Sequence, residues 1–308
     1  MSLLTIGTVA FDSIETPYGK VEKVIGGACT YISWSASYFM NDIHLVSIVG
    51  EDFPKDELAA LEQRGVNLDG LEIVKGGKSF FWAGKYHNNM NSRDTLATDL
   101  NVLADFNPIL PEKAKSCEYV MLGNLTPSIQ AQVLDQLDGS QKLIALDTMN
   151  FWMDIAMDEL KAVIARVDLL TINDEEARQL SGEHSLVQAA EIILAMGPKY
   201  LVIKKGEHGA LMFFEGKMFF APALPLAEVF DPTGAGDTFA GGMMGYLAMT
   251  DEISFENMKR ALIAGSAMAS YCVEDFSLNR LKTLDKAQVI TRIEAFKKLM
   301  DFDFPLDF

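Results

Sequence analysis

The segment from Asp231 to Tyr246 holds residue types whose order could support chemistry on an anion. It begins Asp-Pro-Thr-Gly-Ala-Gly-Asp-Thr-Phe, and an apolar helical pattern starts near Gly236 and continues to about Ala248. The first N–H groups of a helix have no internal partner and lie at its positive end, so they favour an anion such as a transferring phosphoryl group. Small residues at 234–236 let a ligand approach the backbone closely. We therefore predict an anion site at the start of this helix.

Asp237 is the acidic residue at the rim of this predicted anion site. A lone Asp at the start of a helix more often caps the helix than reacts. Beside a phosphoryl group, however, a carboxylate is also placed to take the proton of an attacking hydroxyl, which typically contributes about 10²–10⁴-fold in rate. On the residues alone, both interpretations stay open.

Two other glycine-rich phosphate sites fit the sequence poorly. The chain has no G-x-x-x-x-G-K-[ST] run, so it is not a P-loop enzyme. The run Gly234-Ala-Gly236 is followed by Asp-Thr-Phe, so the third glycine of the dinucleotide-binding fingerprint is missing, and the run lies far from a first βα turn. The sequence therefore gives little support to a Rossmann dehydrogenase.

The elements that must position this segment form an alternation of short apolar runs and longer helical patterns. The apolar runs are nearly continuous, as in strands buried on both faces, and the alternation predicts a mostly parallel sheet covered by helices. The predicted strands are Leu3–Val9, His44–Val49, Tyr119–Leu122, Leu143–Leu146, Leu169–Ile172 and Tyr200–Ile203. The predicted helices are Tyr31–Met40, Lys55–Arg64, Ile129–Leu137, Glu159–Arg166, Leu186–Ala195 and Met258–Cys272.

Two segments break this alternation. Thr16–Ile25 is short and polar, with a turn predicted at Gly19, and Ile73–Thr98 carries alternating and aromatic residues around the turn-like run Asn88–Asn91, which indicates an antiparallel hairpin. We predict a single domain over residues 1–308, with excursions at about 13–25 and 73–99 that together form a small β-sheet lid. Ordinary surface excursions are the alternative.

The composition indicates which binding partners and which cellular compartment to expect. The 26 basic and 43 acidic residues give a formal net charge of −17, which repels nucleic-acid phosphates and opposes anionic substrates, although acidity can also serve solubility alone. The three cysteines form no disulfide framework, and the four histidines show no metal-ligand spacing. We find no signal peptide and no membrane span, so we expect a cytoplasmic protein that binds neither nucleic acid nor a membrane.

The run from Asp231 to Phe239 resembles the C-terminal signature of the ribokinase family of carbohydrate kinases, also called the PfkB family. It is similar to the pattern D-T-x-G-A-G-D, with Pro232 in place of the more usual Thr, and four further segments occur in family order. The resemblance implies a three-layer ribokinase-like α/β fold with a lid, and transfer of the γ-phosphoryl group of ATP to a hydroxyl of a small sugar or polyol. It implies Asp237 as catalytic base and an anion hole made by Gly234, Ala235 and Gly236.

The acceptor side of the site is expected near the N-terminus. Asp12 resembles the family's Asp that binds substrate hydroxyls, and Gly26-Gly27 resembles the glycine pair beneath the substrate, whereas the residues alone would indicate a loop or cap residue and a turn. Tyr31 or a neighbour stands where many relatives have Asn, which departs from a ribose-type contact. Arg93, in the predicted lid, is assigned to the substrate because a phosphorylated acceptor would favour a cation in the cleft.

The nucleotide side is expected after two later strands. Asn173 and Glu176 resemble the family's N-x-x-E motif, so Asn173 is assigned to ATP and Glu176 to Mg²⁺ through water. The residues alone predict N-capping by Asn173, and the two roles are compatible. The segment from Lys204 to Gly209 resembles the family's nucleotide loop, which assigns Lys204, Gly206 and Gly209 to ATP, although a lysine at a strand end is usually solvated.

Asp231 and Thr233 match positions that can bind a monovalent cation in this family, so K⁺ is an optional cofactor beside ATP and Mg²⁺. A homodimer formed through the lid is a further expectation from the family. The aromatic residues Phe80–Trp82 and Tyr86 could stack on the acceptor or could pack the lid or a dimer interface. Two functional alternatives stay open: an adenosine-type nucleoside kinase, and a catalytically silent sugar- or nucleotide-binding protein on the same fold.

Overall fold

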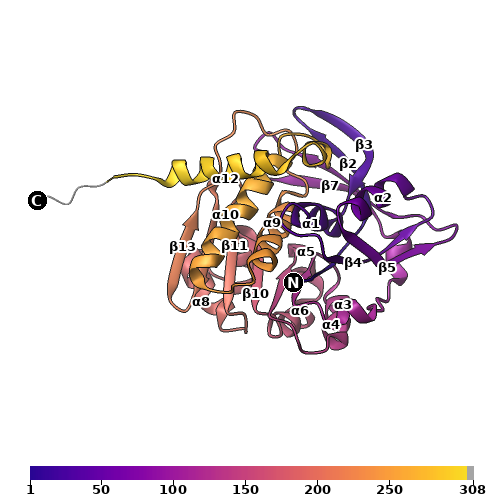
Figure 1. The fold of residues 1–308 in the computed structure, drawn as a ribbon, viewed down its shortest axis with the longest axis horizontal. Helices are drawn as coiled ribbons and strands as arrows, with labels where there is room; N and C mark the ends of the chain where they lie inside the picture. Colours follow the sequence, from indigo (N-terminus) through magenta and orange to yellow (C-terminus); the bar gives the residue numbers. More distant parts are fainter. Residues whose placement is uncertain (304–308) are drawn as a thin grey trace, which may run out of the picture.

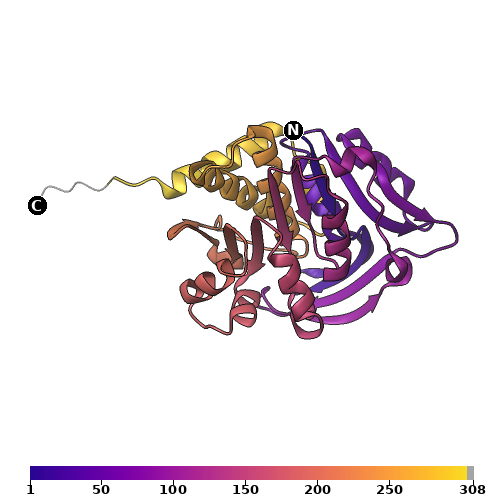
Figure 2. The ribbon, with the colours of Figure 1, turned by 90° about the horizontal axis from the view of Figure 1, so that it is seen from below.

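A nine-stranded sheet forms the middle layer of this computed structural model, which describes residues 1–303 (Figures 1 and 2). The strands lie in the order β13-β12-β11-β10-β9-β8-β1-β4-β5, and neighbours are parallel except for the pairs β11–β12 and β12–β13. Their bounds are Leu3–Ile6 (β1), Ile43–Gly50 (β4), Val66–Val74 (β5), Tyr119–Leu122 (β8), Leu143–Asp147 (β9), Leu169–Asn173 (β10), Tyr200–Lys204 (β11), Ala210–Phe214 (β12) and Lys217–Ala221 (β13).

Helices cover both faces of this sheet and give the molecule its three layers. One face packs against Ala28–Ala36 (α1), Lys55–Gln63 (α2), Ala235–Thr250 (α9), Phe255–Cys272 (α10), Asn279–Lys282 (α11) and Lys286–Met300 (α12). The other face packs against Glu112–Lys115 (α3), Pro127–Gln136 (α4), Asn150–Ile155 (α5), Met157–Ile164 (α6), Asp174–Ser181 (α7) and Leu186–Leu194 (α8). The layered, mostly parallel architecture predicted from the alternation of patterns is confirmed.

Most predicted elements are present with shifts of a few residues at their ends. The first strand ends at Ile6 instead of Val9, because the chain bends there and enters a second sheet, and α1 starts three residues before Tyr31. The strands β5, β12 and β13 were not among those predicted. Because β5 and β13 are the edges of the sheet, most of their residues are partly buried or exposed, and neither strand has a continuous apolar run.

A second, four-stranded sheet with the order β3-β2-β6-β7 stands beside the main sheet. Its strands are Ala10–Thr16 (β2), Gly19–Gly26 (β3), Phe80–Tyr86 (β6) and Arg93–Asp99 (β7). The strand pairs β2–β3 and β6–β7 are antiparallel hairpins, and β2 pairs with β6 in parallel. The small sheet therefore joins the two excursions that the sequence predicts, and its action as a lid stays a prediction.

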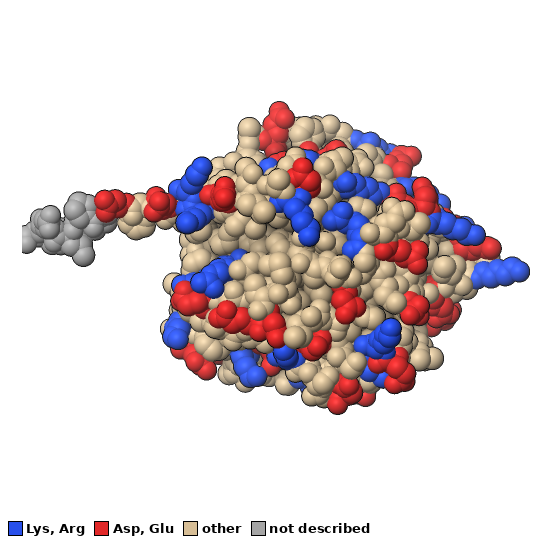
Figure 3. Space-filling model, viewed as in Figure 1, with Lys and Arg blue, Asp and Glu red and all other residues tan. Residues whose placement is uncertain are grey.

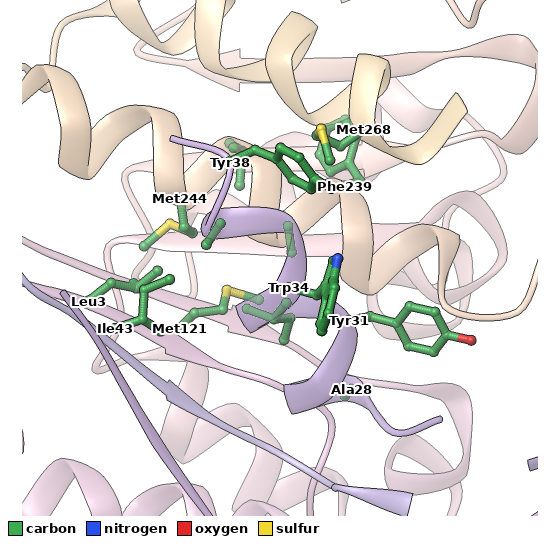
Figure 4. Close-up of a cluster of buried hydrophobic side chains, with 14 of the residues drawn as sticks. Leu3, Ala28, Tyr31, Trp34, Tyr38, Ile43, Met121, Phe239, Met244 and Met268 are labelled. Carbon is green, nitrogen blue, oxygen red and sulfur yellow. The ribbon is translucent and has the colours of Figure 1, made fainter. Parts of the chain in front are cut away.

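Helices α1 and α9 lie side by side on the same face of the main sheet, and the side chains of Tyr31 and Trp34 from α1 are buried there (Figure 4). Two glycines of α9 permit this close packing: a Cβ at Gly241 would lie 2.2 Å from the Ile32 carbonyl oxygen, and one at Gly245 would lie 2.8 Å from Ala36 Cα. Dense packing here fixes the start of α9 relative to α1. The small residues after Asp237 thus serve helix packing as well as any ligand.

Charged residues of both signs are spread around the face shown in Figure 3, while its middle is largely uncharged. No helix within residues 1–303 is long and apolar enough to cross a membrane. The three cysteines, Cys29, Cys117 and Cys272, are buried and unpaired in the structure, as expected from their spacing.

Candidate active site

The start of α9 has the backbone geometry of an anion site. Gly234 precedes the helix with φ +74°, and a Cβ at this position would lie 2.4 Å from the Tyr31 ring, so only glycine fits. Within the described residues, the N–H groups of Gly236 and Asp237 donate to no backbone or side-chain oxygen, whereas the Ala235 N–H donates to the Pro232 carbonyl at 3.2 Å. The first turn therefore presents free donors to a ligand.

Asp237 lies in this first turn and is partly exposed. The pKa of its carboxyl is raised to about 7, mainly by burial and further by the charge of Asp147, while the nearby cations Lys204 and Arg93 lower it. A carboxyl group with such a pKa can accept and release a proton near neutral pH. The side chain makes no helix-capping hydrogen bond, which leaves its oxygens free for other partners.

Asp12 lies on β2, where the small sheet meets the main domain, and its side chain is buried. A Cβ at Gly26 would lie 1.9 Å from the Asp12 Oδ2 atom, and Gly27 has φ +93°, so the structure requires both glycines. Burial raises the pKa of Asp12 to about 8, and the charges of Asp231 and Asp237 add to the increase. The carboxyl of Asp12 thus belongs to the same electrostatic cluster as Asp237.

Lys204 ends β11 and forms an ion pair with Asp147 at the end of the nearby strand β9, with 2.5 Å between Nζ and Oδ2. The Thr171 hydroxyl donates to the same carboxylate oxygen at 3.0 Å. A Cβ at Gly236 would lie 3.2 Å from Lys204 Nζ, so the ammonium group is next to the first turn of α9. Burial opposes the charged form, but Asp147 and Glu176 raise the pKa of Lys204. A cation is thereby held beside the free N–H groups.

Asn173 and Glu176 form a reciprocal capping box at the start of α7. The Asn173 N–H donates to Glu176 Oε2 at 2.7 Å, and the Glu176 N–H donates to Asn173 Oδ1 at 2.8 Å. The pKa of Glu176 is raised to about 7, mainly by burial, although Lys204 lowers it. The capping role expected for Asn173 is confirmed, and the second Glu176 oxygen stays available for a ligand.

Asp231 is fully buried just before α9 and organises two backbone segments. Its carboxylate accepts hydrogen bonds from the Thr233 N–H at 2.9 Å and the Ser277 N–H at 3.3 Å. Burial raises the pKa of Asp231. The described residues contain no group of three or more His, Cys, Asp or Glu side chains arranged around a metal position.

The small sheet turns one face toward this cluster. The Thr233 hydroxyl donates to the Tyr86 hydroxyl at 3.2 Å, which ties β6 to the segment before α9. In the strand registers, Trp82 is opposite Asp12 and Arg93 is opposite Tyr86, and registered partners project to the same face of a sheet. The Arg93 guanidinium also lies 5.7 Å from the Trp82 ring. Trp82 and Arg93 therefore face the cluster with Asp12 and Tyr86.

The loop after β11 completes the surroundings of the site. Gly206 and Gly209 have φ of +53° and +81°, and a Cβ at Gly209 would lie 2.2 Å from the Ala221 carbonyl oxygen. A Cβ at Gly206 would lie 3.0 Å from Asn91 Oδ1, so the turn of the β6–β7 hairpin reaches this loop. The small sheet thus spans from the acceptor side to the loop assigned to ATP.

The structure brings the predicted residues to one place, the carboxyl ends of the parallel strands. Residues that are far apart in the sequence therefore lie close together at this edge of the sheet, as is usual in open α/β sheets. Asp147 belongs to the same place but was not among the predicted site residues. Trp82 and Tyr86 lie there as well; for them the sequence left open stacking on the acceptor and packing of the lid or a dimer interface. Asp147 had a detectable signal, because it directly follows a predicted buried strand, just as Asn173 and Lys204 do.

Comparisons with known proteins show the family to which this chain belongs. The model of the family described as "pfkB family carbohydrate kinase" matches residues 2–283. The cytidine kinase of Thermococcus kodakarensis is 31% identical over 79% of this chain and 87% of its own length. The fructokinase of Klebsiella pneumoniae is 32% identical over 79% of this chain and 83% of its own length.

Solved structures share the same fold. An E. coli protein named as a candidate ribokinase II, solved in complex with ATP and Mg²⁺, has a TM-score of 0.76 with 19% identity and covers 96% of this chain and 99% of its own. At that identity the match shows the fold alone. The predicted ribokinase-like fold is thereby confirmed.

Proposed function

Since this chain belongs to the pfkB family of carbohydrate kinases and is a sugar or nucleoside kinase, we propose that Asp237 is the base of its phosphoryl transfer. Asp237 takes the proton of the acceptor hydroxyl, whose oxygen forms a bond to the γ-phosphorus of ATP as the bond to the β-phosphate oxygen breaks and ADP leaves. The observation that carries this assignment is a partly exposed carboxyl with a pKa of about 7, beside unpaired N–H groups. Such a group can accept a proton where the phosphoryl group is held.

The other residues divide into an acceptor side and a nucleotide side. Asp12 and the backbone of Gly26 and Gly27 bind the acceptor, and Arg93 reaches it from the small sheet. The N–H groups of residues 234–236 hold the γ-phosphoryl oxygens as charge shifts. A ligand at Ala235 would share or replace the present bond to the Pro232 carbonyl.

The nucleotide side involves Asn173, Lys204, Gly206 and Gly209. It also offers a fitting place for Mg²⁺, because Glu176 is a buried carboxyl with one oxygen outside its capping box, and Mg²⁺ is usually held by one or two carboxylates, waters and substrate phosphates. Glu176 would hold the ion through water. When bound, Mg²⁺ would neutralise phosphate charge.

A nucleoside is the favoured acceptor. The cytidine kinase relative spans most of both chains, and Trp82 places an aromatic ring on the face that also carries Asp12. An indole ring can stack on a base while the neighbouring carboxyl binds hydroxyls of the attached sugar. A free sugar or polyol is the second candidate, because the fructokinase relative has a comparable percentage identity and an aromatic ring also packs against a sugar face.

Four further assignments belong to this proposal. K⁺ would lie beside Asp231 and Thr233, whose segment is already organised by the hydrogen bond to Ser277. The small sheet would act as a lid, and its outer face would form the homodimer. The unpaired, buried cysteines suit a reducing compartment, which supports a cytoplasmic location.

The test is turnover of Mg·ATP with a panel of nucleosides, sugars, sugar phosphates and polyols, for the wild type and Asp237→Asn. Turnover on one acceptor class that falls by about 10²-fold or more in the variant is the expected result. Asp251→Asn, at the opposite end of α9, is the matched control and should retain activity. Turnover that survives Asp237→Asn would remove Asp237 from its role. ATP binding without turnover on any acceptor would support the silent binding protein instead.

A further inference from the structure

The stability of the fold does not explain the ion pair between Asp147 and Lys204. The side chains of Asp147 and Lys204 are only 7% and 17% exposed, and 2.5 Å separates their charged atoms. Removing two charges from water costs about as much as their attraction returns, so buried pairs are weak contributors to stability. Apolar residues at both strand ends would satisfy the fold equally well. The pair therefore points to a role in the site.

The position of the ammonium group indicates that role. Lys204 Nζ lies next to Gly236, in the first turn of α9, whose N–H groups are unpaired. Among residues 1–303, the ammonium makes one hydrogen bond, to Asp147, although it has three donors. It therefore has the capacity to bind oxygens of a phosphoryl group placed at this helix start.

Asp147 controls where this flexible side chain lies. A lysine has a four-carbon stem with many rotamers, and two other carboxyls, Glu176 and Asp237, compete for its charge in this region. The carboxylate of Asp147 is itself fixed by the hydroxyl of Thr171, which donates to the same oxygen that Lys204 contacts. Asp147 is thus anchored on the sheet in a way that can hold the ammonium in one place.

We infer that Asp147 is a positioning residue for phosphoryl transfer: it holds the Lys204 ammonium against the first turn of α9, where the ammonium neutralises the transferring group, and keeps it from pairing with Asp237. This inference rests on the proposed function for the identity of the transferring group. Lys204 would then contact the phosphoryl oxygens directly, whereas Asp147 acts only through Lys204. A fixed cation at the place where charge shifts can supply a large part of a rate enhancement.

Kinetics of four variants test the arrangement. Lys204→Met should lower kcat by about 10²–10³-fold, as expected for loss of one fixed charge donor at a transition state. Asp147→Asn keeps the shape of the side chain and should lower kcat by about 10²-fold or less, as expected when a catalytic group is misplaced by about 1 Å. The double variant should be no slower than Lys204→Met, because Asp147 has no cation left to position. Lys204→Arg keeps the charge and should retain more activity than Lys204→Met.

The pH dependence distinguishes positioning from mere structural support. The charges that face Asp237 are Asp147 from β9, Lys204 from β11, Arg93 from β7 and Asp12 from β2. Asp147→Asn frees the ammonium to approach Asp237, so the acid limb of kcat/KM should move to lower pH. Lys204→Met should move the same limb to higher pH. A general loosening of the fold would not move the limb in opposite directions.

Binding of nucleotides gives a readout that needs no acceptor. Lys204→Met should weaken the binding of Mg·ATP more than that of Mg·ADP, because the ammonium lies where the γ-phosphoryl group would be held. This difference can be measured by calorimetry even if no acceptor is turned over, so failure of the proposed function and failure of this inference are distinguishable. Lys199→Met, which removes the lysine at the other end of β11, is the matched control and should leave both affinities unchanged.

Three outcomes would overturn the inference. Multiplicative losses of kcat in the double variant would show that the two residues act independently. Equal weakening of Mg·ATP and Mg·ADP would place the ammonium away from the γ-phosphoryl group. If Asp147→Asn raised the Mg²⁺ concentration needed for activity while Lys204→Met did not, Asp147 would be a metal ligand. Thermal melting checks folding, and the double variant, which removes both buried charges together, covers the case in which a single variant fails to fold.

Discussion

The parallel strands carry an aspartate–lysine ion pair at each of their ends, and the two pairs have opposite characters. At the carboxyl ends, Asp147 and Lys204 are buried, 2.5 Å apart, and surrounded by further acids. At the amino ends, Asp168 and Lys199 are 2.9 Å apart, and the lysine side chain is 70% exposed. Water screens the exposed pair and leaves it nearly neutral for stability, whereas the buried pair holds its charges where water cannot relax them.

The same contrast extends to the carboxyl groups around each end. Burial raises the pKa of Asp12 to about 8 and those of Glu176 and Asp237 to about 7, so their ionised forms are disfavoured by the fold. Acids that the native state disfavours are typical of functional sites, where a perturbed pKa serves the reaction. The comparison indicates that the charged residues at the carboxyl ends are arranged for chemistry at a cost in stability. The ion pair at the amino ends behaves as an ordinary exposed pair.

The largest effect expected from a change of the backbone comes from a methyl group at Gly234. Gly234→Ala forces an L residue to φ +74° and places its Cβ 2.4 Å from the Tyr31 ring, so the first turn of α9 must shift. We expect kcat to fall by about 10²-fold or more, since a displacement of about 1 Å at a catalytic group can have that effect. Steady-state kinetics with saturating Mg·ATP would measure it.

Gly182 provides the matched control for this substitution. It has φ +78° at the end of α7, and a Cβ there would have no atom within 4 Å. Gly182→Ala should therefore lower stability by about 1–2 kcal/mol through backbone strain alone and leave kcat unchanged. Equal kinetic losses in the two variants would show that α9 has no special sensitivity.

The second expected effect is a tenfold change in kcat/KM per pH unit. If Asp237 must be ionised to accept the proton, its pKa of about 7 means that log kcat/KM should fall with unit slope as the pH decreases below about 7. The sign follows because protonation removes the base. A pH profile that is flat between about pH 5 and 8 would contradict a base with this pKa. The residual activity of Asp237→Asn should lack this limb.

The third effect concerns stability and Asp12. Its pKa is raised from 3.8 to about 8 on folding, mainly by burial, so between these values the native state binds a proton that the unfolded state has lost. The free energy of unfolding should therefore decrease with rising pH in this window, by about 1.4 kcal/mol per pH unit for this group. Asp12→Asn should remove that contribution, which denaturant unfolding at pH 5 and 7 would measure as a shallower decline.

Asp251, whose pKa is shifted in the opposite direction from that of Asp12, serves as the control. A hydrogen bond from Lys142 lowers the pKa of Asp251, so the group is ionised in both states between pH 5 and 7 and contributes no slope there. Asp251→Asn should leave the pH dependence as it is. A decline unchanged by Asp12→Asn would show that other groups determine it.

The sequence was sufficient for the layered fold because buried parallel strands leave continuous apolar runs, as in Tyr119–Leu122, which was predicted with its correct bounds. It was insufficient for the edge strand β5, where every residue after Val66 is at least partly exposed and the apolar pattern fades. The glycines at 26, 27 and 234 were detectable because positive φ and close approach restrict the residue type.

The parts of the site that the sequence did not reveal depend on pairing across space. Arg93 was assigned to the substrate, but its place beside Trp82 on the face toward the cluster exists only because β6 pairs in parallel with β2 and antiparallel with β7, with a register that no local pattern specifies. The partner of Lys204 likewise comes from the order of strands in the sheet, since Asp147 is 57 positions away along the chain. A lysine at a strand end would otherwise be assigned to solvent.

The smallest expected effect belongs to the amino-end pair. Lys199→Met removes an ammonium that is largely in water, so the free energy of unfolding should change by about 0–1 kcal/mol, and raising the ionic strength should reduce the difference further. Denaturant unfolding at low and high salt would measure both. Lys204→Met, by contrast, leaves Asp147 buried without its partner and should lower stability by about 3–5 kcal/mol with little dependence on salt. Equal losses for the two lysines would mean that burial does not separate the two ends of the sheet, because a screened pair and a desolvated pair must respond differently to removal of one charge.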